Sequence, residues 1–388
     1  MYKLAIVTSH PIQYNAPWFK LLADSGKVRP KVFYTWGESG QGRKYDPDFR
    51  REIEWNIPLL EGYEYTFVKN IAKVPGSHHF KGLINPTLND EIMEWGPDAV
   101  LVYGWNFHSH LRCMRFFHRK VPVLFRGDSN LLDEQPGVKK EIRRLFLKWV
   151  YRHVDYALYV GSNNRKYYLI HGLREDQLVY APHAIDNERF AEPDDDYCRE
   201  AKEWREELGI SDEDLVVLFS GKFESKKDPF FLIELAKRVS DPRLKIIFTG
   251  NGILENLLKE AAQNDARIKF LEFQNQLKMP VVYRLSDIFM LPSRGPGETW
   301  GLGANEAMAS GCVIMLSDKV GGAIDLIQEG KNGIIFRAGD LKKCKALLEK
   351  MLDNREELIK MKKISRELVR SWSYQRIVTA IGELMDKI

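Results

Sequence analysis

Short apolar runs alternate with amphipathic segments of helical period along most of the chain. This alternation is typical of βαβ units, in which helices join parallel strands. The strands expected in a first series are residues 4–9, 31–36, 99–104, 121–125, 156–160 and 178–181. Those expected in a second series are residues 215–220, 245–249, 268–273, 288–292, 313–316 and 333–336. The pattern therefore predicts an α/β protein with two parallel sheets.

A polar, acid-rich stretch, "FAEPDDDYCREAKEWREELGISDED", separates the two series and shows no strand pattern. A chain of 388 residues also exceeds the length at which one core stops growing. We therefore expect an N-terminal domain at 1–190 and a C-terminal domain at 191–372. The final segment, 373–388, has apolar residues at helical spacing and no strand after it, which predicts a helix that packs back on the N-terminal domain.

Composition and charge exclude several classes of protein. A content of 44% hydrophobic and 29% charged residues is that of an ordinary globular protein, and a net charge of +4 is too small to indicate a nucleic-acid partner. We see neither a membrane-spanning apolar run nor a signal peptide, so we expect a cytoplasmic location. The four cysteines lack C-x-x-C spacing, which favours buried, reduced thiols over a zinc site.

Three glycine-containing stretches, "SGKFESKKD", "TGNG" and "GPGETWG", each follow an expected strand and precede a helix-like segment. Ligands of open α/β sheets bind at such strand ends. Lys222 and Lys227 flank the first turn, and ammonium groups suit phosphate oxygens. We therefore expect a diphosphate held without a metal ion; a solvated Lys-rich turn is the alternative.

The stretch "GPGETWGLGANEAMA" places glycines before a helix, whose N-terminus favours an anion. Glu298 in the loop and Glu306 in the helix would be repelled by phosphate, so they suit hydroxyl groups better. The ligand with both features is a nucleoside diphosphate sugar. The alternative is that both are ordinary surface acids. G-x-G-x-x-G and P-loop patterns are absent from the sequence, which argues against a nicotinamide enzyme and a P-loop kinase.

The C-terminal half resembles the retaining GT-B glycosyltransferases of family GT4, also called glycosyltransferase group 1. The resemblance rests on "SGKFESKKDPFFLIELA", "FTGNG", "LSDIFMLPS" and "GETWGLGANEAMASGCVIMLSDKVGGAIDLI", in which Glu298 and Glu306 reproduce the E-x7-E pattern of the family. It implies two Rossmann-like β/α/β domains that face each other across a cleft. It also implies metal-independent sugar transfer with retention of anomeric configuration, without a cofactor.

The resemblance implies a role for each matching residue. Lys222 and Lys227 correspond to the basic diphosphate ligands, Glu298 to the residue that contacts the transferred sugar, and Glu306 to the ribose ligand. Lys222, Lys227 and Glu298 are the expected catalytic residues. The full expected donor site is Gly221, Lys222, Lys227, Gly250, Asn251, Glu298, Thr299, Gly301, Leu302 and Glu306. The chain departs from the family pattern at Asp228, where glycine is usual, and at Ile324 and Asp325, where Pro-Glu is common.

The first expected strand leads into "SHPIQYNAPWF", and "HPIQY" resembles a subgroup of bacterial GT4 enzymes. His10, Gln13 and Tyr14 can hydrogen-bond an acceptor, and Tyr14 and Trp18 can stack on a sugar face. A structural role at the strand end is the alternative for His10. In "VLFRGDSN", Arg126 stands where many relatives have histidine and can bind phosphate or carboxylate. Asp128 is the candidate for the acceptor hydroxyl. The acceptor residues we expect are His10, Gln13, Tyr14, Arg126 and Asp128.

Basic residues alternate with apolar ones at helical spacing in segment 138–153. Such a helix can lie on anionic lipid, which would place the protein at the inner face of the membrane. It can also meet a lipid-diphosphate or charged glycan acceptor. We favour a third interpretation, an outer helix with its apolar stripe turned inward and its charges solvated.

Together these features predict a glycosyltransferase of polysaccharide biosynthesis. It would move sugar from a UDP-, GDP- or ADP-sugar to a hydroxyl of a glycan, lipid-linked or small-molecule acceptor. A glycosidase would pair Glu298 and Glu306 as acid and nucleophile, but leaves the lysines unexplained. The same donor-binding features also suit a sugar-nucleotide epimerase of related fold, or a non-catalytic nucleotide-sugar-binding subunit of a glycan assembly complex.

Overall fold

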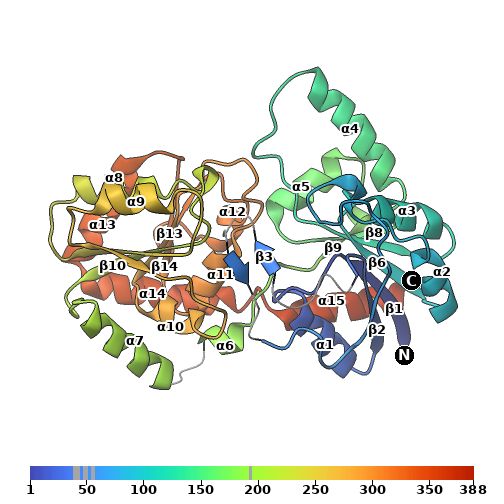
Figure 1. Ribbon diagram of the computed structural model, residues 1–388, viewed down its shortest axis with the longest axis horizontal. Helices are drawn as coiled ribbons and strands as arrows, with labels where there is room; N and C mark the ends of the chain where they lie inside the picture. The colour runs from blue at the N-terminus through green and yellow to red at the C-terminus, as the bar shows by residue number, and fades with distance from the viewer. Residues whose placement is uncertain (38–43, 47–50, 54–56, 192–194) are drawn as a thin grey trace. The chain divides into compact units, whose positions relative to one another are not determined.

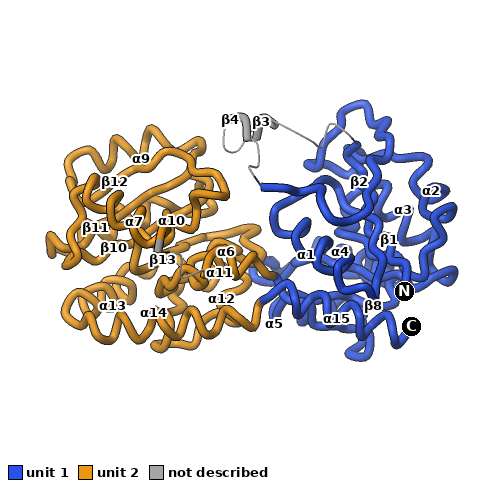
Figure 2. Tube along the Cα trace, turned by 90° about the horizontal axis from the view of Figure 1, so that it is seen from below, with its two compact units in different colours: residues 1–43, 57–183, 373–388 blue, residues 44–56, 184–372 orange. Residues whose placement is uncertain are grey.

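The computed structural model describes residues 1–37, 44–46, 51–53, 57–191 and 195–388. The chain divides into two compact units, shown in blue and orange in Figure 2. The first unit comprises residues 1–43, 57–183 and 373–388, and the second comprises residues 44–56 and 184–372. Part of the acid-rich stretch, 192–194, lies outside the described residues.

The first unit contains a seven-stranded parallel sheet in the order β5-β2-β1-β6-β7-β8-β9 (Figure 1). Its strands are β1 (Tyr2–Thr8), β2 (Val28–Tyr34), β5 (Glu64–Phe67), β6 (Ala99–Tyr103), β7 (Val123–Arg126), β8 (Tyr156–Tyr159) and β9 (Leu178–Tyr180). The central strands β1 and β6 are buried on both faces, as their continuous apolar runs predict.

The helices of the first unit are α1 (Ala16–Asp24), α2 (Leu88–Trp95), α3 (His108–Phe117), α4 (Val138–Tyr151), α5 (Ser162–Ile170) and α15 (Tyr374–Lys387), with 3-10 turns η2 (Phe80–Gly82) and η3 (Glu175–Gln177). Helix α15 buries Ile377, Ile381 and Met385 and packs against α1 and β9. The Ser373 hydroxyl accepts a hydrogen bond from the backbone N–H of Arg376 and caps its start. The last helix is therefore part of the first unit.

The second unit contains a six-stranded parallel sheet in the order β12-β11-β10-β13-β14-β15. Its strands are β10 (Leu215–Ser220), β11 (Leu244–Thr249), β12 (Ile268–Leu271), β13 (Ile288–Leu291), β14 (Val313–Ser317) and β15 (Gly333–Phe336). Strands β3 (Lys44–Asp46) and β4 (Arg51–Ile53) form a separate two-stranded antiparallel sheet. The prediction of two parallel sheets in an α/β protein is confirmed.

The helices of the second unit are α6 (Asn187–Ala191), α7 (Asp195–Glu207), α8 (Phe230–Arg238), α9 (Glu255–Ala262), α10 (Met279–Arg284), α11 (Leu302–Ala309), α12 (Ala323–Leu326), α13 (Leu341–Asp353) and α14 (Arg355–Val369), with the 3-10 turn η4 (Ser225–Lys227). Strands β10, β11, β13 and β14 are almost entirely buried, and α8, α13 and α14 pack apolar faces into the same core. The expected strands of the second series are all present, within a few residues of their predicted ends.

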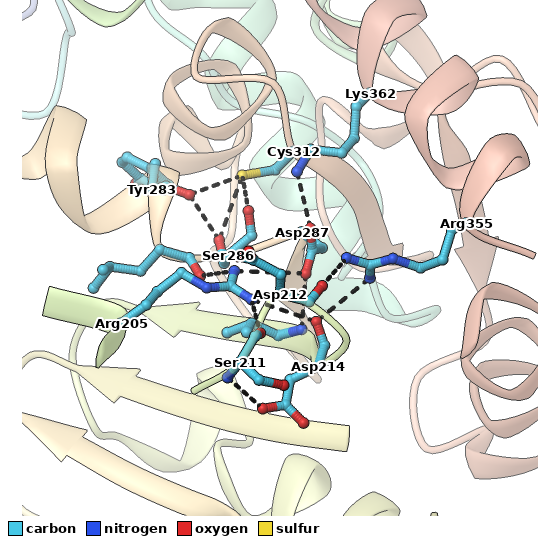
Figure 3. Close-up of polar contacts among 12 residues, drawn as sticks. Arg205, Ser211, Asp212, Asp214, Tyr283, Ser286, Asp287, Cys312, Arg355 and Lys362 are labelled. Atoms are coloured by element: carbon cyan, nitrogen blue, oxygen red, sulfur yellow. Dashed lines mark hydrogen bonds and ion pairs between the residues drawn. The ribbon is translucent and has the colours of Figure 1, made fainter. Parts of the chain in front are cut away.

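A buried polar network lies at the amino ends of β10 and β13 (Figure 3). The Asp287 carboxylate contacts Lys362 Nζ at 2.9 Å and accepts a hydrogen bond from the Val216 N–H at 3.0 Å. Arg205 donates to the carbonyls of Leu285 and Ser211, 2.9 Å each. Burial raises the pKa of Asp287, but the opposing effect of Lys362 and the Val216 N–H is larger, and the net pKa lies below its usual range. This network joins the sheet to α7 and α14.

Two expectations need correction. In α4, Val150 is buried as expected, but Ile142 and Leu145 are 62% and 69% exposed. Ile142, Leu145 and Phe146 of the predicted inward stripe are exposed, because the helix packs inward through Leu147, Val150 and Tyr151. The cysteines are free, but Cys198 is exposed.

Among the described residues, no helix combines the length and apolar character that a membrane span requires.

Candidate functional site

Three loops of the second unit start at the carboxyl edge of its sheet. Strand β10 lies between β11 and β13: the chain builds the sheet on one side of β10 through β11 and β12 and then crosses to its other side at β13. This arrangement is the topological switch point at which open α/β sheets bind ligands. Residues 221–228 follow β10, residues 250–254 follow β11, and residues 292–301 follow β13. The loops that the sequence singled out therefore begin at one edge.

Glycines allow the first two loops to touch through their backbones. A Cβ atom on Gly250 would lie 2.0 Å from the carbonyl oxygen of Gly221, and one on Gly252 would lie 2.5 Å from that of Phe223. The Gly221 N–H donates to the Thr249 carbonyl at 3.1 Å, and the Phe223 N–H donates to the Asn251 carbonyl at 2.8 Å. No larger residue fits at Gly250 without movement of the backbone. The Asn251 side chain donates to Glu255 at 3.0 Å.

The structure brings Lys227 and Glu298 together. Lys227 Nζ donates to Glu298 Oε2 at 2.6 Å, and the Ser293 hydroxyl donates to the same oxygen at 3.2 Å. The two charged side chains are 18% and 11% exposed, so solvent reaches both ends of the pair. The Lys227 stem runs past Gly221, and Lys222 lies on the same loop, partly exposed. A cation and an acid predicted to bind one ligand thus lie side by side.

Asp228, which stands where glycine was expected, links two of the loops. Its carboxylate contacts the Arg294 guanidinium, and the Arg294 N–H donates to the Lys226 carbonyl at 2.8 Å. Asp228 adopts a left-handed backbone conformation, with φ +49°. Burial raises the pKa of Asp228, and the neighbouring guanidinium opposes this shift. The acid therefore fastens the lysine turn to the Glu298 loop.

The Glu298 loop leads into α11 through Gly301, whose φ is +94°. A Cβ atom there would lie 2.8 Å from Val320 Cγ1, so glycine is required by both conformation and space. Thr299 and Leu302 are partly exposed on either side of Gly301. The Gly321 N–H donates to the Glu298 carbonyl at 2.9 Å, which holds the loop.

Glu306 lies in the second turn of α11 and is 3% exposed. Its Oε2 accepts a hydrogen bond from the Tyr283 hydroxyl at 2.8 Å. It is therefore a buried carboxylate held by a hydroxyl group, and the alternative of an ordinary surface acid is wrong for this residue. Tyr283, on α10, was not predicted, since a tyrosine within an apolar helix gives no signal of its own.

In the first unit, His10, Gln13 and Tyr14 follow β1, which lies between β2 and β6 at the switch point of that sheet. The His10 ring packs edge-on against Trp36, with centroids 5.1 Å apart, and its Nδ1 lies 2.9 Å from Ser9 Oγ. The three residues are partly exposed. Trp18 has no exposed surface; the expectation that it stacks on a sugar is wrong, because α1 turns it into the core.

Arg126 ends β7 and is 3% exposed. Its guanidinium donates to the carbonyls of Ala181 and Pro182 at 2.8 and 3.0 Å. These contacts fasten the segment after β9 to β7 and occupy both terminal nitrogens. Arg126, which was predicted to bind the acceptor, therefore also holds two backbone carbonyl groups in place.

Asp128 lies two residues beyond β7, and its Oδ2 is 3.6 Å from Nε2 of His183. Burial lowers the pKa of His183, and the Asp128 carboxylate opposes this shift. His183 was not predicted, although it follows β9 at the same edge of the sheet. Applying the strand-end rule to "VYAPHAID" would have identified it.

Among residues 1–37, 44–46, 51–53, 57–191 and 195–388, no group of three or more His, Cys, Asp or Glu side chains is arranged to hold a metal ion. Metal independence nevertheless stays a prediction.

Comparison with known proteins finds matches over part of the chain. Residues 200–368 match the family model described as "Glycosyl transferases group 1". The chain is 29% identical over 194 residues to a D-inositol 3-phosphate glycosyltransferase of Corynebacterium efficiens, covering 47% of this chain and 45% of that protein. It is 28% identical over 267 residues to the enzyme of that name from Corynebacterium glutamicum, covering 66% and 62%. The chain thus spans about half to three fifths of the length of these relatives.

A solved structure shares the fold over the whole chain. Anabaena Alr3699/HepE, in complex with UDP and glucose, covers 100% of both chains with a TM-score of 0.71 and 16% sequence identity. At that identity the likeness shows the fold alone. The chain therefore has the GT-B type of fold, with two Rossmann-like parallel-sheet domains.

Proposed function

We propose that the protein is a glycosyltransferase that moves a sugar from a nucleotide diphosphate donor to a hydroxyl acceptor with retention of anomeric configuration. The observation that carries the proposal is the contact between Lys227 and Glu298 at the switch point of the second sheet. A cation and an acid on glycine loops suit a ligand that presents phosphate and hydroxyl groups together. The match to glycosyl transferases of group 1, and the UDP and glucose bound by the HepE protein, support this ligand class.

The donor groups are assigned as follows. Lys227 and Lys222 bind the diphosphate, with the backbone at Gly221, Gly301 and Leu302. Glu298 accepts hydrogen bonds from the transferred sugar. In the free protein the Glu298 carboxylate contacts Lys227. Donor binding replaces this contact with two others, one between Lys227 and the diphosphate and one between Glu298 and the sugar.

The remaining donor residues frame the nucleoside and the loops. Glu306 accepts from the ribose while it keeps its hydrogen bond to Tyr283. Gly250, Asn251 and Thr299 shape the loops around the diphosphate. A carboxylate that is already buried and oriented costs little further ordering when a sugar hydroxyl reaches it.

Departure of the nucleotide diphosphate is the demanding step. The bond from the anomeric carbon to the diphosphate oxygen breaks, and negative charge develops on that oxygen. Preorganised ammonium groups and the N–H groups at the start of α11 stabilise this charge. The acceptor hydroxyl then bonds to the same face of the anomeric carbon and gives its proton to the leaving phosphate oxygen. The step needs no metal ion and no protein nucleophile.

The acceptor is a glycan, a lipid-linked sugar or a small hydroxylated molecule, bound by His10, Gln13, Tyr14 and Asp128 at the edge of the first sheet. Arg126 acts there through the carbonyl groups that it holds. We place the protein in the cytoplasm, with the inner face of the membrane as its working surface when the acceptor is lipid-linked.

A panel of UDP-, GDP- and ADP-sugars tests the proposal. Purified protein is incubated with each sugar nucleotide and a bacterial glycan or lipid acceptor, with and without EDTA. We expect nucleotide release that depends on donor and acceptor and survives EDTA, with retention read by NMR of the product. Conversion of the donor without an acceptor would identify an epimerase. Binding without turnover would identify a non-catalytic subunit, and absence of both binding and turnover would refute the donor class.

A further inference from the structure

Helix α4 carries apolar side chains on two opposite faces. Its inner face, formed by Leu147, Val150 and Tyr151, is buried in the first unit. Its outer face carries Val138, Ile142 and Leu145, which are 76%, 62% and 69% exposed. These three positions are four and three residues apart and therefore share one side of the helix. We call them the outer ridge.

Helix α4, which carries the outer ridge, lies at the periphery of its unit. Figure 1 shows α4 at the top, reached from β7 by the long loop 127–137. Aromatic side chains continue the ridge at the C-terminal half of the helix. Phe146 is 41% exposed, and its ring centroid lies 5.4 Å from Trp105 and 5.7 Å from Trp149. Tryptophan rings of this kind favour the boundary between water and lipid.

Basic side chains flank the outer ridge on both sides. Lys148 and Arg152 lie on one flank, and Lys139 lies about a quarter turn from the ridge on the other; all three residues are exposed. Glu141, the acid within α4, is near Lys140 at 3.7 Å and Arg144 at 3.9 Å, so two cations offset its charge. An apolar strip bordered by cations is the pattern of helices that lie in the surface of a membrane.

We propose that the outer ridge and its basic flanks dock on an anionic lipid bilayer. Charge complementarity selects this occupant, because anionic headgroups surround an inserted helix on both flanks while acyl chains cover the ridge between them. A second copy of this chain would bring its own basic flanks against these, and like charges would repel. Each Lys or Arg near such a surface contributes about 1 kcal/mol, or about a fivefold gain in affinity.

Docking through α4 also places the acceptor edge of the first sheet at the lipid surface. The loop 127–137 runs from the end of β7, past Asp128, directly into α4. A lipid-linked acceptor held in the bilayer would meet that edge without leaving the membrane. This last step rests on the proposed glycosyltransferase function; lipid binding itself does not.

Flotation of the full chain with phosphatidylcholine vesicles, with and without phosphatidylglycerol, tests the proposal. We expect binding to the anionic vesicles alone, weakened by added salt. The double variant Ile142→Ser/Leu145→Ser should bind at least ~10-fold more weakly, because two apolar side chains no longer enter the lipid. The matched control is Ile359→Ser, at an apolar residue on α14 that is 65% exposed.

A second variant tests the charges. Lys148→Ala/Arg152→Ala should lower affinity by about 25-fold, at about fivefold for each charge. Lys363→Ala, at a lysine of α14 that is 79% exposed, should leave binding unchanged. Every substituted residue is exposed, so each variant should fold normally. Thermal unfolding checks this.

Three results would overturn the proposal: wild-type protein that ignores anionic vesicles, control variants that lose binding equally, or a solution dimer that Ile142→Ser/Leu145→Ser dissociates. The last would make the outer ridge a subunit interface. The vesicle assay contains no sugar nucleotide, so its failure leaves donor binding untouched. Conversely, failure of the sugar-nucleotide panel leaves lipid docking untouched.

Discussion

The two edges of the second sheet use the same kind of ion pair for different purposes. At the amino edge, Asp287 is buried and is held by Lys362 and the backbone of β10 (Figure 3). At the carboxyl edge, Lys227 and Glu298 stand on glycine-containing loops and remain partly exposed. A pair enclosed between strands and helices serves folding, because no ligand can replace either partner. A pair on loops that solvent reaches can exchange a partner for phosphate or hydroxyl groups.

The largest expected effect is on the amino edge. Asp287→Asn keeps the size of the side chain but removes the charge that Lys362 contacts at 2.9 Å and Arg205 at 3.9 Å. Removing one partner of a buried pair should lower the free energy of unfolding by about 3 kcal/mol. Urea denaturation measures this loss, with Asp353→Asn as the control at an 82% exposed acid. Donor affinity, measured by calorimetry, should not change; a parallel loss would contradict the separation of the two edges.

The same carboxylate predicts a pH dependence. The pKa of folded Asp287 lies below its ordinary value, even though burial alone would raise it, because Lys362 and the Val216 N–H favour the charged form. Its stabilising contribution is therefore fully present above the unfolded pKa of about 4 and is lost as pH falls through the folded pKa. Unfolding curves collected from neutral to acid pH should show wild type and Asp287→Asn converging at the acid end. A difference in unfolding free energy that stays constant across pH would show that the charge of Asp287 does not stabilise the folded protein.

The next effect is on the carboxyl edge. Lys227→Ala removes the charge that meets the diphosphate and should weaken donor binding by about 30-fold, or about 2 kcal/mol. Stability should hardly change, because solvent can hydrate the Glu298 left behind. Lys237→Ala, which removes an exposed lysine paired with Glu234, is the matched control. Unchanged donor affinity in Lys227→Ala would remove this residue from the site.

A smaller effect is expected at Tyr283, which contacts Glu306 and not the donor itself. Tyr283→Phe removes the hydroxyl that holds Glu306 and should weaken donor affinity by about fivefold, or about 1 kcal/mol. The loss should affect intact nucleotides and disappear for sugar 1-phosphates, which lack the ribose. An equal loss for both ligands would show that Tyr283 acts on the whole loop.

The smallest effect is expected at Asp228. Asp228→Gly relieves a left-handed conformation that costs about 1 kcal/mol, and it loses an ion pair with an exposed arginine worth at most about 1 kcal/mol. The two terms oppose each other, so stability should change by no more than about 1 kcal/mol from wild type. Asp228→Asn, which tolerates the same backbone, separates loss of the ion pair from relief of strain. A large loss of donor affinity in both variants would show that the link to Arg294 positions Lys227.

Much of the fold follows from the sequence, because buried parallel strands are continuous apolar runs. The exception in the first sheet is the edge strand β5, whose sequence EYTF is only four residues long and alternates polar and aromatic residues, so it lacks the continuous apolar run that marks the buried strands. The grouping of Lys227 with Glu298 could also be predicted, since strand ends of one parallel sheet share an edge. Side-chain direction could not. Trp18 and the outer ridge of α4 were misjudged because helical spacing identifies faces but not which face meets the core.

Because α15 belongs to the first unit, the two units become complete in a different order from the one in which they begin to be synthesised. The sheet of the second unit uses the continuous stretch from Leu215 to Phe336, whereas the first unit needs residues 373–388 to cover α1 and β9. During synthesis the sheet of the second unit can therefore form before α15, the helix that packs against α1, has been made. The half of the molecule made first is completed last, and it is the half that carries α4.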